Sequence, residues 1–318
     1  MYDAGAIVIA QGISKNTSLT WLEIRNNAIG NDGCKALTKA LETNTTLAIL
    51  DLWANQIGVD GAKALSDMLH INKTLTRLNL TTNDIRMEGA LSIAEALKTN
   101  TTLTSLELGG NQIWTSGAIA LAQALKINTT LKTLLLDYNQ IKCDGAEQLA
   151  HLLKTNQTLT RLGLQVNAIE SRGALALADA LQMNTTLQNL EFHGNRFENE
   201  STSVRIFLKV IQTNKTLQTL TLLKSLYPPP NYEGIQDVAD ALSINFTLLE
   251  FTPKNILYDH FLERNQEIQK TKEQFKKKKY CLFDVMQKMN SQNGLIQIQD
   301  EFEKVFDLVD RNVVKYYF

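Results

Sequence analysis

The sequence has 318 residues, 44% of them hydrophobic, and a formal net charge of −1 at pH 7. A charge so close to zero favours neither a nucleic acid nor a membrane surface as partner. The three cysteines are an odd number without a repeated spacing, which argues against a disulfide framework and favours a reducing compartment.

The first residues give no signal for export. No charged segment followed by an apolar core opens the sequence, and no apolar run approaches the length of a membrane-spanning helix. We therefore predict neither a signal peptide nor a transmembrane segment, and we expect a cytoplasmic protein.

The chain opens within a unit of a repeat. Gly5 precedes Gly33 by 28 residues, and Asn16 precedes Asn44 by the same number, so residues 5–14 are predicted to form a repeat helix without a strand before it. This helix is either a natural N-terminal cap over the edge of the first strand or the start of a fragment of a longer array. The initial methionine favours the cap.

The full unit reads L-x-x-L-x-L-x-x-N-x-I and is clearest over residues 46–57. Its first leucine recurs every 28 residues, at Leu19, Leu47, Leu75, Leu103, Leu131, Leu159 and Leu187. One unit is too small to bury its own apolar face, so the units are expected to stack. The fold class is therefore α/β, a solenoid with a parallel inner sheet and outer helices.

Within one unit, alternation over residues 49–53 predicts a short strand, followed by a bend at Asn55 and a helix over residues 62–70. Gly61 is expected to permit close backbone packing where this helix starts. Asn55 is expected to satisfy backbone groups of the bend, because its side chain both donates and accepts hydrogen bonds. Its counterparts are Asn27, Asn83, Asn111, Asn139, Asn167 and Asn195.

Asn72 closes the unit, and it lies in an N-x-[ST] triplet. The same triplet begins at Asn16, Asn44, Asn100, Asn128, Asn156, Asn184, Asn214 and Asn245. In a secreted protein these would be glycosylation sites. Because they recur at the end of each repeat helix, we interpret them as structural.

At the level of these motifs, the chain resembles leucine-rich repeat proteins of the ribonuclease-inhibitor type. The sequence pattern N-x-I-G-x-x-G-A-x-A-L-x-x-A-L-x-x-N-T-T-L is similar to the repeats of NLRC3-like receptors and of GTPase-activating proteins for Ran. The resemblance covers roughly residues 3–255. It implies a horseshoe-shaped scaffold, and it says little about function because this family shares its scaffold among many functions.

Beyond about residue 195 the period loosens. The next anchors, Leu217 and Leu248, follow after 30 and 31 residues, with insertions at 198–202 and at 227–232, where three prolines stand together. Apolar stripes after residue 256 predict helices. We expect three parts: a half-repeat or cap helix over 1–18, leucine-rich repeats over 19–255, and a helical cap or small helical domain over 256–318.

Candidate binding residues lie between the buried leucines, where they are expected to face the concave side of the sheet. Strand pairing does not require aromatic or charged residues there, and exposed Trp, Tyr and Arg commonly anchor protein interfaces. We expect a protein-binding concave face formed by Trp21, Glu23, Arg25, Asp51, Trp53, Arg77, Glu107, Asp137, Tyr138, Arg161, Glu191 and His193. The mixed charges argue against a nucleic-acid groove.

No motif indicates an enzyme. The four histidines and the cysteines lack the spacing of a metal site, and the glycines mark the repeat period rather than a phosphate-binding loop. We predict no catalytic residues, no metal and no cofactor.

We therefore predict a monomeric, non-catalytic protein-interaction scaffold. The short array with a helical tail resembles effector proteins that intracellular bacteria deliver into host cytosol. The alternatives are a GTPase-activating protein of the Ran-specific type and a fragment of an NLR-type immune receptor.

Overall fold

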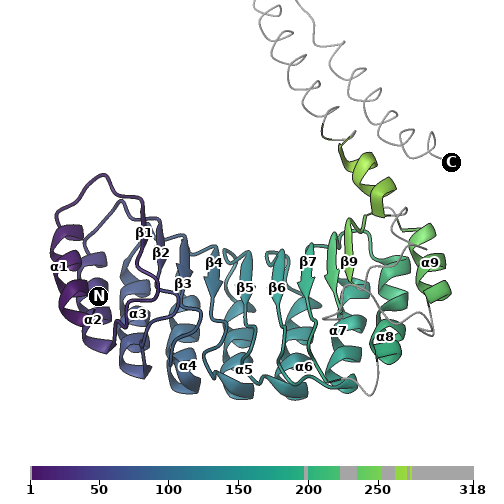
Figure 1. Ribbon diagram of the computed structural model, residues 1–318, viewed down its shortest axis with the longest axis horizontal. Coiled ribbons are helices and arrows are strands. Elements are labelled where there is room, and N and C mark those ends of the chain that lie inside the picture. Colours follow the sequence, from purple (N-terminus) through teal and green to yellow (C-terminus); the bar gives the residue numbers. More distant parts are fainter. Residues whose placement is uncertain are drawn as a thin grey trace, which may run out of the picture.

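A computed structural model describes residues 2–196, 200–222, 235–245, 247–252, 262–270 and 273. Within these ranges strands and helices alternate along the chain (Figure 1). The helices are α1 (Asp3–Ile13), α2 (Asn31–Leu41), α3 (Val59–Ile71), α4 (Arg86–Leu97), α5 (Trp114–Leu125), α6 (Lys142–Leu153), α7 (Ser171–Met183), α8 (Glu200–Thr213) and α9 (Ile235–Ser243). The strands are β1 (Trp21–Glu23), β2 (Ile49–Asp51), β3 (Arg77–Asn79), β4 (Ser105–Glu107), β5 (Thr133–Leu135), β6 (Arg161–Gly163), β7 (Asn189–Glu191), β8 (Thr219–Thr221) and β9 (Glu250–Thr252).

All described strands form one parallel sheet in the order β1 to β9. Equivalent repeat positions are paired: Leu22 lies opposite Leu50, which lies opposite Leu78. Each strand has three residues, so the strand expected over 49–53 ends at Asp51. The chain turns soon afterwards, because Ala54 adopts the left-handed conformation with φ of 55°. The predicted α/β solenoid with a parallel sheet is confirmed.

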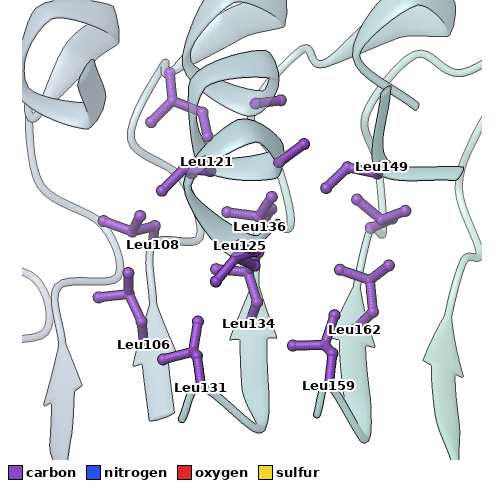
Figure 2. Packing of buried hydrophobic residues seen from close by; sticks show 14 of the residues in the cluster. Leu106, Leu108, Leu121, Leu125, Leu131, Leu134, Leu136, Leu149, Leu159 and Leu162 are labelled. Atoms are coloured by element: carbon purple, nitrogen blue, oxygen red, sulfur yellow. The ribbon is translucent and has the colours of Figure 1, made fainter. Parts of the chain in front are cut away.

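The core lies between the sheet and one layer of helices. Leu47, Leu50, Leu52 and Ile57 are fully buried in the second unit, as are Leu65 and Leu69 of α3. Figure 2 shows the same layer further along, with Leu134 and Leu136 against Leu121 and Leu125. Full burial of a leucine side chain contributes about 1.5–3 kcal/mol, so the recurring leucines drive the stacking of the units.

Two columns of asparagines join neighbouring units. In the bend column, Asn55 Nδ2 donates to Ile24 O and Leu52 O, and its Oδ1 accepts the Asn27 and Ile29 N–H groups. These hydrogen bonds satisfy backbone groups that no strand partner reaches. The predicted role of the bend asparagine is confirmed.

The second column closes each unit. Asn72 Nδ2 donates to Leu41 O and Asn44 O in the preceding unit, while its Oδ1 accepts the Thr74 and Leu75 N–H groups. The asparagines of this column are buried, except for the partly buried Asn156 and the exposed Asn16. The asparagine side chains of the triplets after Asn16 are therefore held by hydrogen bonds within the fold, as the structural interpretation of these triplets predicted.

The repeated glycine lies inside the first turn of its helix, since α3 begins two residues before Gly61. A Cβ on Gly61 would lie 2.6 Å from Ile57 Cγ2 and 3.3 Å from Cys34 Cβ. No side chain fits in that space without movement. The predicted close packing is confirmed, and the helix starts earlier than expected because its first turn includes this glycine.

At the C-terminal end, residues 262–270 are helical and contact the last repeat. Asn265 Nδ2 donates to Asn245 O and Leu248 O, and Arg264 donates to the carbonyl oxygens of Leu242, Ser243 and Asn245. Of these carbonyl groups, Leu242 O and Asn245 O occupy the positions that the closing asparagine of a further repeat would bind, as Leu41 O and Asn44 O are bound by Asn72. The short helix therefore closes this end of the asparagine column.

Several sequence predictions fall outside the described residues. These are the insertion at 227–232 with its three prolines, the first two residues of the insertion at 198–202, and the predicted helices after residue 273; residues 200–202 belong to α8.

Candidate functional site

The candidate site is the face of the sheet that lies opposite the helix layer, which we call the open face. Its side chains come from the first and third positions of each strand and from the residues just after the strand. The leucine at the middle position points into the core and is fully buried in β2 to β8. All twelve candidate residues occupy these open-face positions or the adjacent turn, yet they differ widely in exposure.

Asp51 is the candidate that departs most from expectation, because it is 5% exposed. Its carboxylate accepts hydrogen bonds from Arg25 Nη2 at 2.7 Å, from Asn79 Nδ2 at 3.1 Å and from the Trp53 N–H at 3.0 Å. Arg25 also pairs with Glu23. Asp51 therefore orients its neighbours from within the sheet surface, and it is not an open acidic contact as the sequence suggested.

Two further arginines each form an ion pair with a glutamate of the neighbouring strand. Arg77 Nη2 lies 2.6 Å from Glu107 Oε1, and Arg161 Nη2 lies 2.6 Å from Glu191 Oε1. Both glutamate side chains are largely buried, while both arginines are about half exposed. Each arginine donates from both Nε and Nη2 to one glutamate oxygen, and these charge-assisted hydrogen bonds restrain the guanidinium on the open face.

A hollow of about 470 Å³ lies beside the second of these pairs. Its lining residues come from β6 to β9 and the turns after them: Arg161, Gln165, Asn189, Glu191, His193, Thr219, Thr221 and Glu250. Gln165 Nε2 donates to Glu191 Oε2, and Asn189 Nδ2 donates to Thr219 Oγ1. The lining is polar and already connected by hydrogen bonds.

Asp137 lies over a glycine. A Cβ on Gly163 would be 2.9 Å from both carboxylate oxygens of Asp137, so the missing side chain makes room for the carboxylate. Asp137 Oδ1 accepts the Gln165 N–H at 2.8 Å. Burial raises the pKa of Asp137 to about 6, against a lowering effect of that hydrogen bond, and the nearby Glu191 raises it further. The pKa of this carboxyl group is therefore well above the ordinary value of 3.8 for an aspartate.

Aromatic side chains project from the N-terminal and middle parts of the open face. Trp21 is 58% exposed, Trp53 is 42% exposed and Tyr138 is 59% exposed. Tyr138 follows Asp137 in the turn and has a φ of 59°, a conformation that side chains other than glycine rarely adopt. These three large aromatic side chains are exposed at positions where strand pairing does not require an aromatic residue.

Sequence reasoning missed Gly163 and the last lining residues of the hollow. Thr219, Thr221 and Glu250 occupy the same strand positions as earlier candidates. The loosened period obscured them, although counting forward from Leu217 and Leu248 would have found them. Gly163 gave no signal, because its role is to leave space for a residue 26 positions earlier.

No group of three or more His, Cys, Asp or Glu side chains that could hold a metal ion occurs in the described part of the chain. Cys34 is fully buried, and burial raises the pKa of its thiol to about 12, so it remains a protonated core residue. Among the described helices, none is long and apolar enough to cross a membrane.

The repeats have a direct match to a family model. The model described as Leucine Rich repeat matches residues 15–37, 43–66, 72–94, 99–122, 128–150 and 155–178. The chain contains leucine-rich repeats. The matches begin 27 to 29 residues apart, and each includes one strand and the start of the following helix. Leucine-rich repeat domains are typically interaction scaffolds rather than catalysts.

Comparison with whole proteins gives little information beyond the presence of leucine-rich repeats. A search among curated proteins gives no match. One similar solved structure is Leiomodin-1 Actin-Binding Site 2 (ABS2), with 21% sequence identity and a TM-score of 0.36 over 70% of this chain and 97% of that chain. A likeness of that degree has no bearing on what this chain binds.

Proposed function

We propose that the protein is a non-catalytic scaffold that binds a protein partner on the open face of its sheet. The observation that carries this proposal is the exposure of Trp53 and Tyr138 on a surface of pre-oriented ion pairs. Aromatic side chains lose little conformational entropy on binding and bury a large area, and they are enriched among the residues that dominate interface energies.

The ion pairs support the same proposal. Arg77 and Arg161 are each fixed by a glutamate of the next strand, so a partner would meet arginines whose orientation is already determined. Pre-organised groups lose less entropy when a complex forms, which favours affinity. The absence of one dominant charge on this face favours a protein partner with mixed polarity over a polyanion such as nucleic acid.

Delivery into a host cell, as an effector of an intracellular bacterium, is part of this proposal on the strength of the sequence resemblance alone. It directs the choice of partner source toward eukaryotic cytosol. No observation in the described structure favours the Ran-specific GTPase activator or the immune-receptor fragment over the scaffold.

The test compares two variants in the intact protein. Trp53→Ala with Tyr138→Ala removes the exposed aromatic groups of the open face, and Trp114→Ala removes a tryptophan that is 53% exposed at the start of α5, outside the strands. Partners are captured from eukaryotic cytosol by cross-linking, identified by mass spectrometry and then titrated as purified proteins by calorimetry.

We expect one partner to bind the parent protein and Trp114→Ala equally, and to bind the double variant at least about tenfold more weakly, since hot-spot residues typically cost 2 kcal/mol or more. Circular dichroism and urea unfolding confirm that all three proteins fold. If every identified partner binds the double variant as tightly as the parent protein, the open face is not the binding site.

A further inference from the structure

The loops that lead from each helix to the next strand carry positive charge and no negative charge. We call the loops at residues 70–76, 98–104, 126–132, 154–160, 182–188 and 212–218 the closing edge. They contain no Asp or Glu, whereas they contain Lys73, Lys98, Lys126, Lys132, Lys154 and Lys215. Each closing asparagine donates to a carbonyl oxygen of the preceding unit, as Asn128 Nδ2 does to Asn100 O. The loops therefore stack into one continuous edge of the solenoid.

The opposite edge of the solenoid has the reverse charge. The bend segments there are residues 53–60, 81–88, 109–116, 137–144 and 165–172, and their only cationic residues are Arg86, Lys142 and Arg172. Their acidic residues are Asp60, Asp84, Glu88, Asp137, Asp144 and Glu170. The formal net charge of −1 therefore conceals a separation of charge across the molecule. A partner that approaches the closing edge meets a positive potential.

Helix stability explains part of this pattern. Half of the closing-edge lysines are C-cap residues, where a cation offsets the negative end of the helix dipole; these are Lys98, Lys126 and Lys154. The others lie beyond the helix ends. The helices contribute Glu95, which is paired with Lys98, and in the preceding loop Glu42 is paired with Lys39. The remaining closing-edge lysines form no ion pair within the described residues.

Exposed apolar side chains lie along the same edge. The residue before the closing asparagine is more than half exposed in alternate units, at Ile71, Ile127, Met183 and Ile244. The units between them have threonine at this position, and its hydroxyl donates to the end of the helix, as Thr99 Oγ1 does to Ala96 O. Threonine therefore meets the structural need of this position. The apolar side chains there remain in water.

We propose that the closing edge binds a membrane surface rich in anionic phospholipid. The lysine ammonium groups are attracted to the charged headgroups, and the side chains of Ile127 and Met183 enter the boundary between headgroups and acyl chains. Electrostatic attraction and insertion of apolar side chains are the two contributions by which peripheral proteins lie on a bilayer. The open face takes no part in this contact.

The composition of the closing edge favours a bilayer over a protein or a nucleic acid. Its loops contain no Arg, Trp, Tyr or Phe, although these residues dominate protein interfaces and aromatic residues stack on the bases of single strands. Its apolar residues lie two units apart, at least roughly 10 Å from the strand spacing alone. A fluid acyl layer accepts apolar side chains at any spacing, whereas a folded partner needs a matching pocket for each.

The test of charge is the variant Lys126→Gln with Lys132→Gln. Neither side chain forms a hydrogen bond or an ion pair within the described residues, so the contacts of the fold are kept. The matched control is Lys63→Gln with Lys142→Gln, which removes the same charge from exposed lysines outside the closing edge. Co-sedimentation of the full chain with phosphatidylcholine vesicles containing about 30% phosphatidylserine measures binding.

We expect the parent protein and the control to bind these vesicles and not vesicles of phosphatidylcholine alone. The Lys126→Gln/Lys132→Gln variant should bind at least about tenfold more weakly, because each lysine near an anionic surface contributes about fivefold. Binding of the parent protein should weaken as salt concentration rises. A parent protein that stays in solution, or equal binding of the variant and its control, would overturn the proposal.

The test of insertion is Ile127→Gln with Met183→Gln. Its control is Leu91→Gln with Leu175→Gln, at apolar residues that are 40% and 49% exposed on α4 and α7. The first variant should bind the anionic vesicles at least about tenfold more weakly than its control, because each inserted methylene contributes about fourfold. Circular dichroism and urea unfolding confirm that both fold. Equal binding of the two would reject insertion of the closing edge.

A fluorophore shows directly which residues contact the bilayer. Ile127→Cys labelled with an environment-sensitive maleimide should gain intensity and shift to the blue on anionic vesicles, whereas Leu175→Cys should not. Cys34 and Cys143 are buried, and the labelled parent protein gives the background. Equal spectral changes at both labelled positions would contradict a contact made by the closing edge.

Two further outcomes would assign the edge or the membrane differently. Binding to immobilised polyglutamate without binding to anionic vesicles would mean that the closing edge takes an acidic protein segment and not a bilayer. Trp53→Ala with Tyr138→Ala should bind the vesicles as the parent protein does. Loss of vesicle binding in that variant, with retention in Lys126→Gln/Lys132→Gln, would place the membrane contact on the open face and reject the closing edge.

Discussion

Asn111 Nδ2 donates to the carbonyl oxygen of Leu80, 31 residues earlier in the sequence, at 2.8 Å. The same nitrogen donates to Leu108 O and Gly109 O within its own unit, and Asn111 Oδ1 accepts the Ile85 N–H. One fully buried side chain therefore ties two consecutive bends together. Repetition of this arrangement makes the solenoid a series of nearest-neighbour contacts.

Asn111→Ala is expected to destabilise the protein by about 2–4 kcal/mol, because it leaves several buried backbone groups without hydrogen bonds. The matched control is Asn27→Ala at the same position of the first unit. Asn27 is only half-buried and its side chain donates to Arg25 O alone among the described residues. Urea unfolding measures both variants. Equal losses would show that the bend itself, and not the link between units, gives the asparagine its importance.

Gly145→Ala is expected to destabilise the protein by about 1–3 kcal/mol through overpacking. A Cβ at this position would lie 2.4 Å from Ile141 Cγ2 and 3.3 Å from Ala118 Cβ. Gly12→Ala, in the open space at the end of α1, is expected to stabilise it by about 0.5–1 kcal/mol, because alanine favours a helix. Chemical denaturation of the two variants should give opposite signs. A gain in stability for Gly145→Ala would contradict the close packing of neighbouring helices.

Asp137→Asn is expected to change how stability depends on pH. The pKa of Asp137 is raised to about 6 in the folded protein by burial, above its ordinary value of 3.8. The folded state therefore binds more protons between these two values, and this group lowers stability as pH rises from about 4 to above 6. The full effect above pH 6 is at most about 3 kcal/mol.

The asparagine variant keeps an acceptor for the Gln165 N–H but has no ionisable group. Its stability minus that of the parent protein, measured by urea unfolding from pH 4 to pH 8, should rise with pH and level off above pH 6. A difference that stays constant over this range would mean that Asp137 has the same pKa in the folded and unfolded protein.

Asn265→Ala is expected to loosen the last repeat and to leave the central repeats unchanged. The variant loses the hydrogen bonds to Asn245 O and Leu248 O at a position with no solvent exposure. In a solenoid each unit contacts only its neighbours, so the effect should decay along the array. Hydrogen exchange should accelerate in peptides over 241–252 and remain the same over 100–130.

The control for that experiment is Gln266→Ala, which removes one exposed hydrogen bond to Leu249 O on the same short helix. Gln266→Ala should accelerate hydrogen exchange over 241–252 much less than Asn265→Ala does. Uniform acceleration along the whole chain in Asn265→Ala would indicate that the repeats unfold as one cooperative block.

The repeat period was sufficient to predict the fold. The spacing of the leucines in residues 46–57 predicts a strand, a bend and a stacked neighbour, because a single unit is too small to bury Leu47, Leu50 and Leu52 by itself. The boundaries were less accurate. α3 starts two residues before Gly61 and β2 ends at Asp51, since local turns and left-handed residues such as Ala54 decide where an element ends.

The sequence by itself determined the repeat, the class of fold and the positions that face away from the core. Only the tertiary structure decided which polar groups at those positions are available. Asp51 is enclosed by Arg25 and Asn79, and Asp137 lies in the space above Gly163, while Trp53 and Tyr138 stay in water. In each case the deciding neighbour lies one repeat away, so availability depends on stacking and not on local sequence.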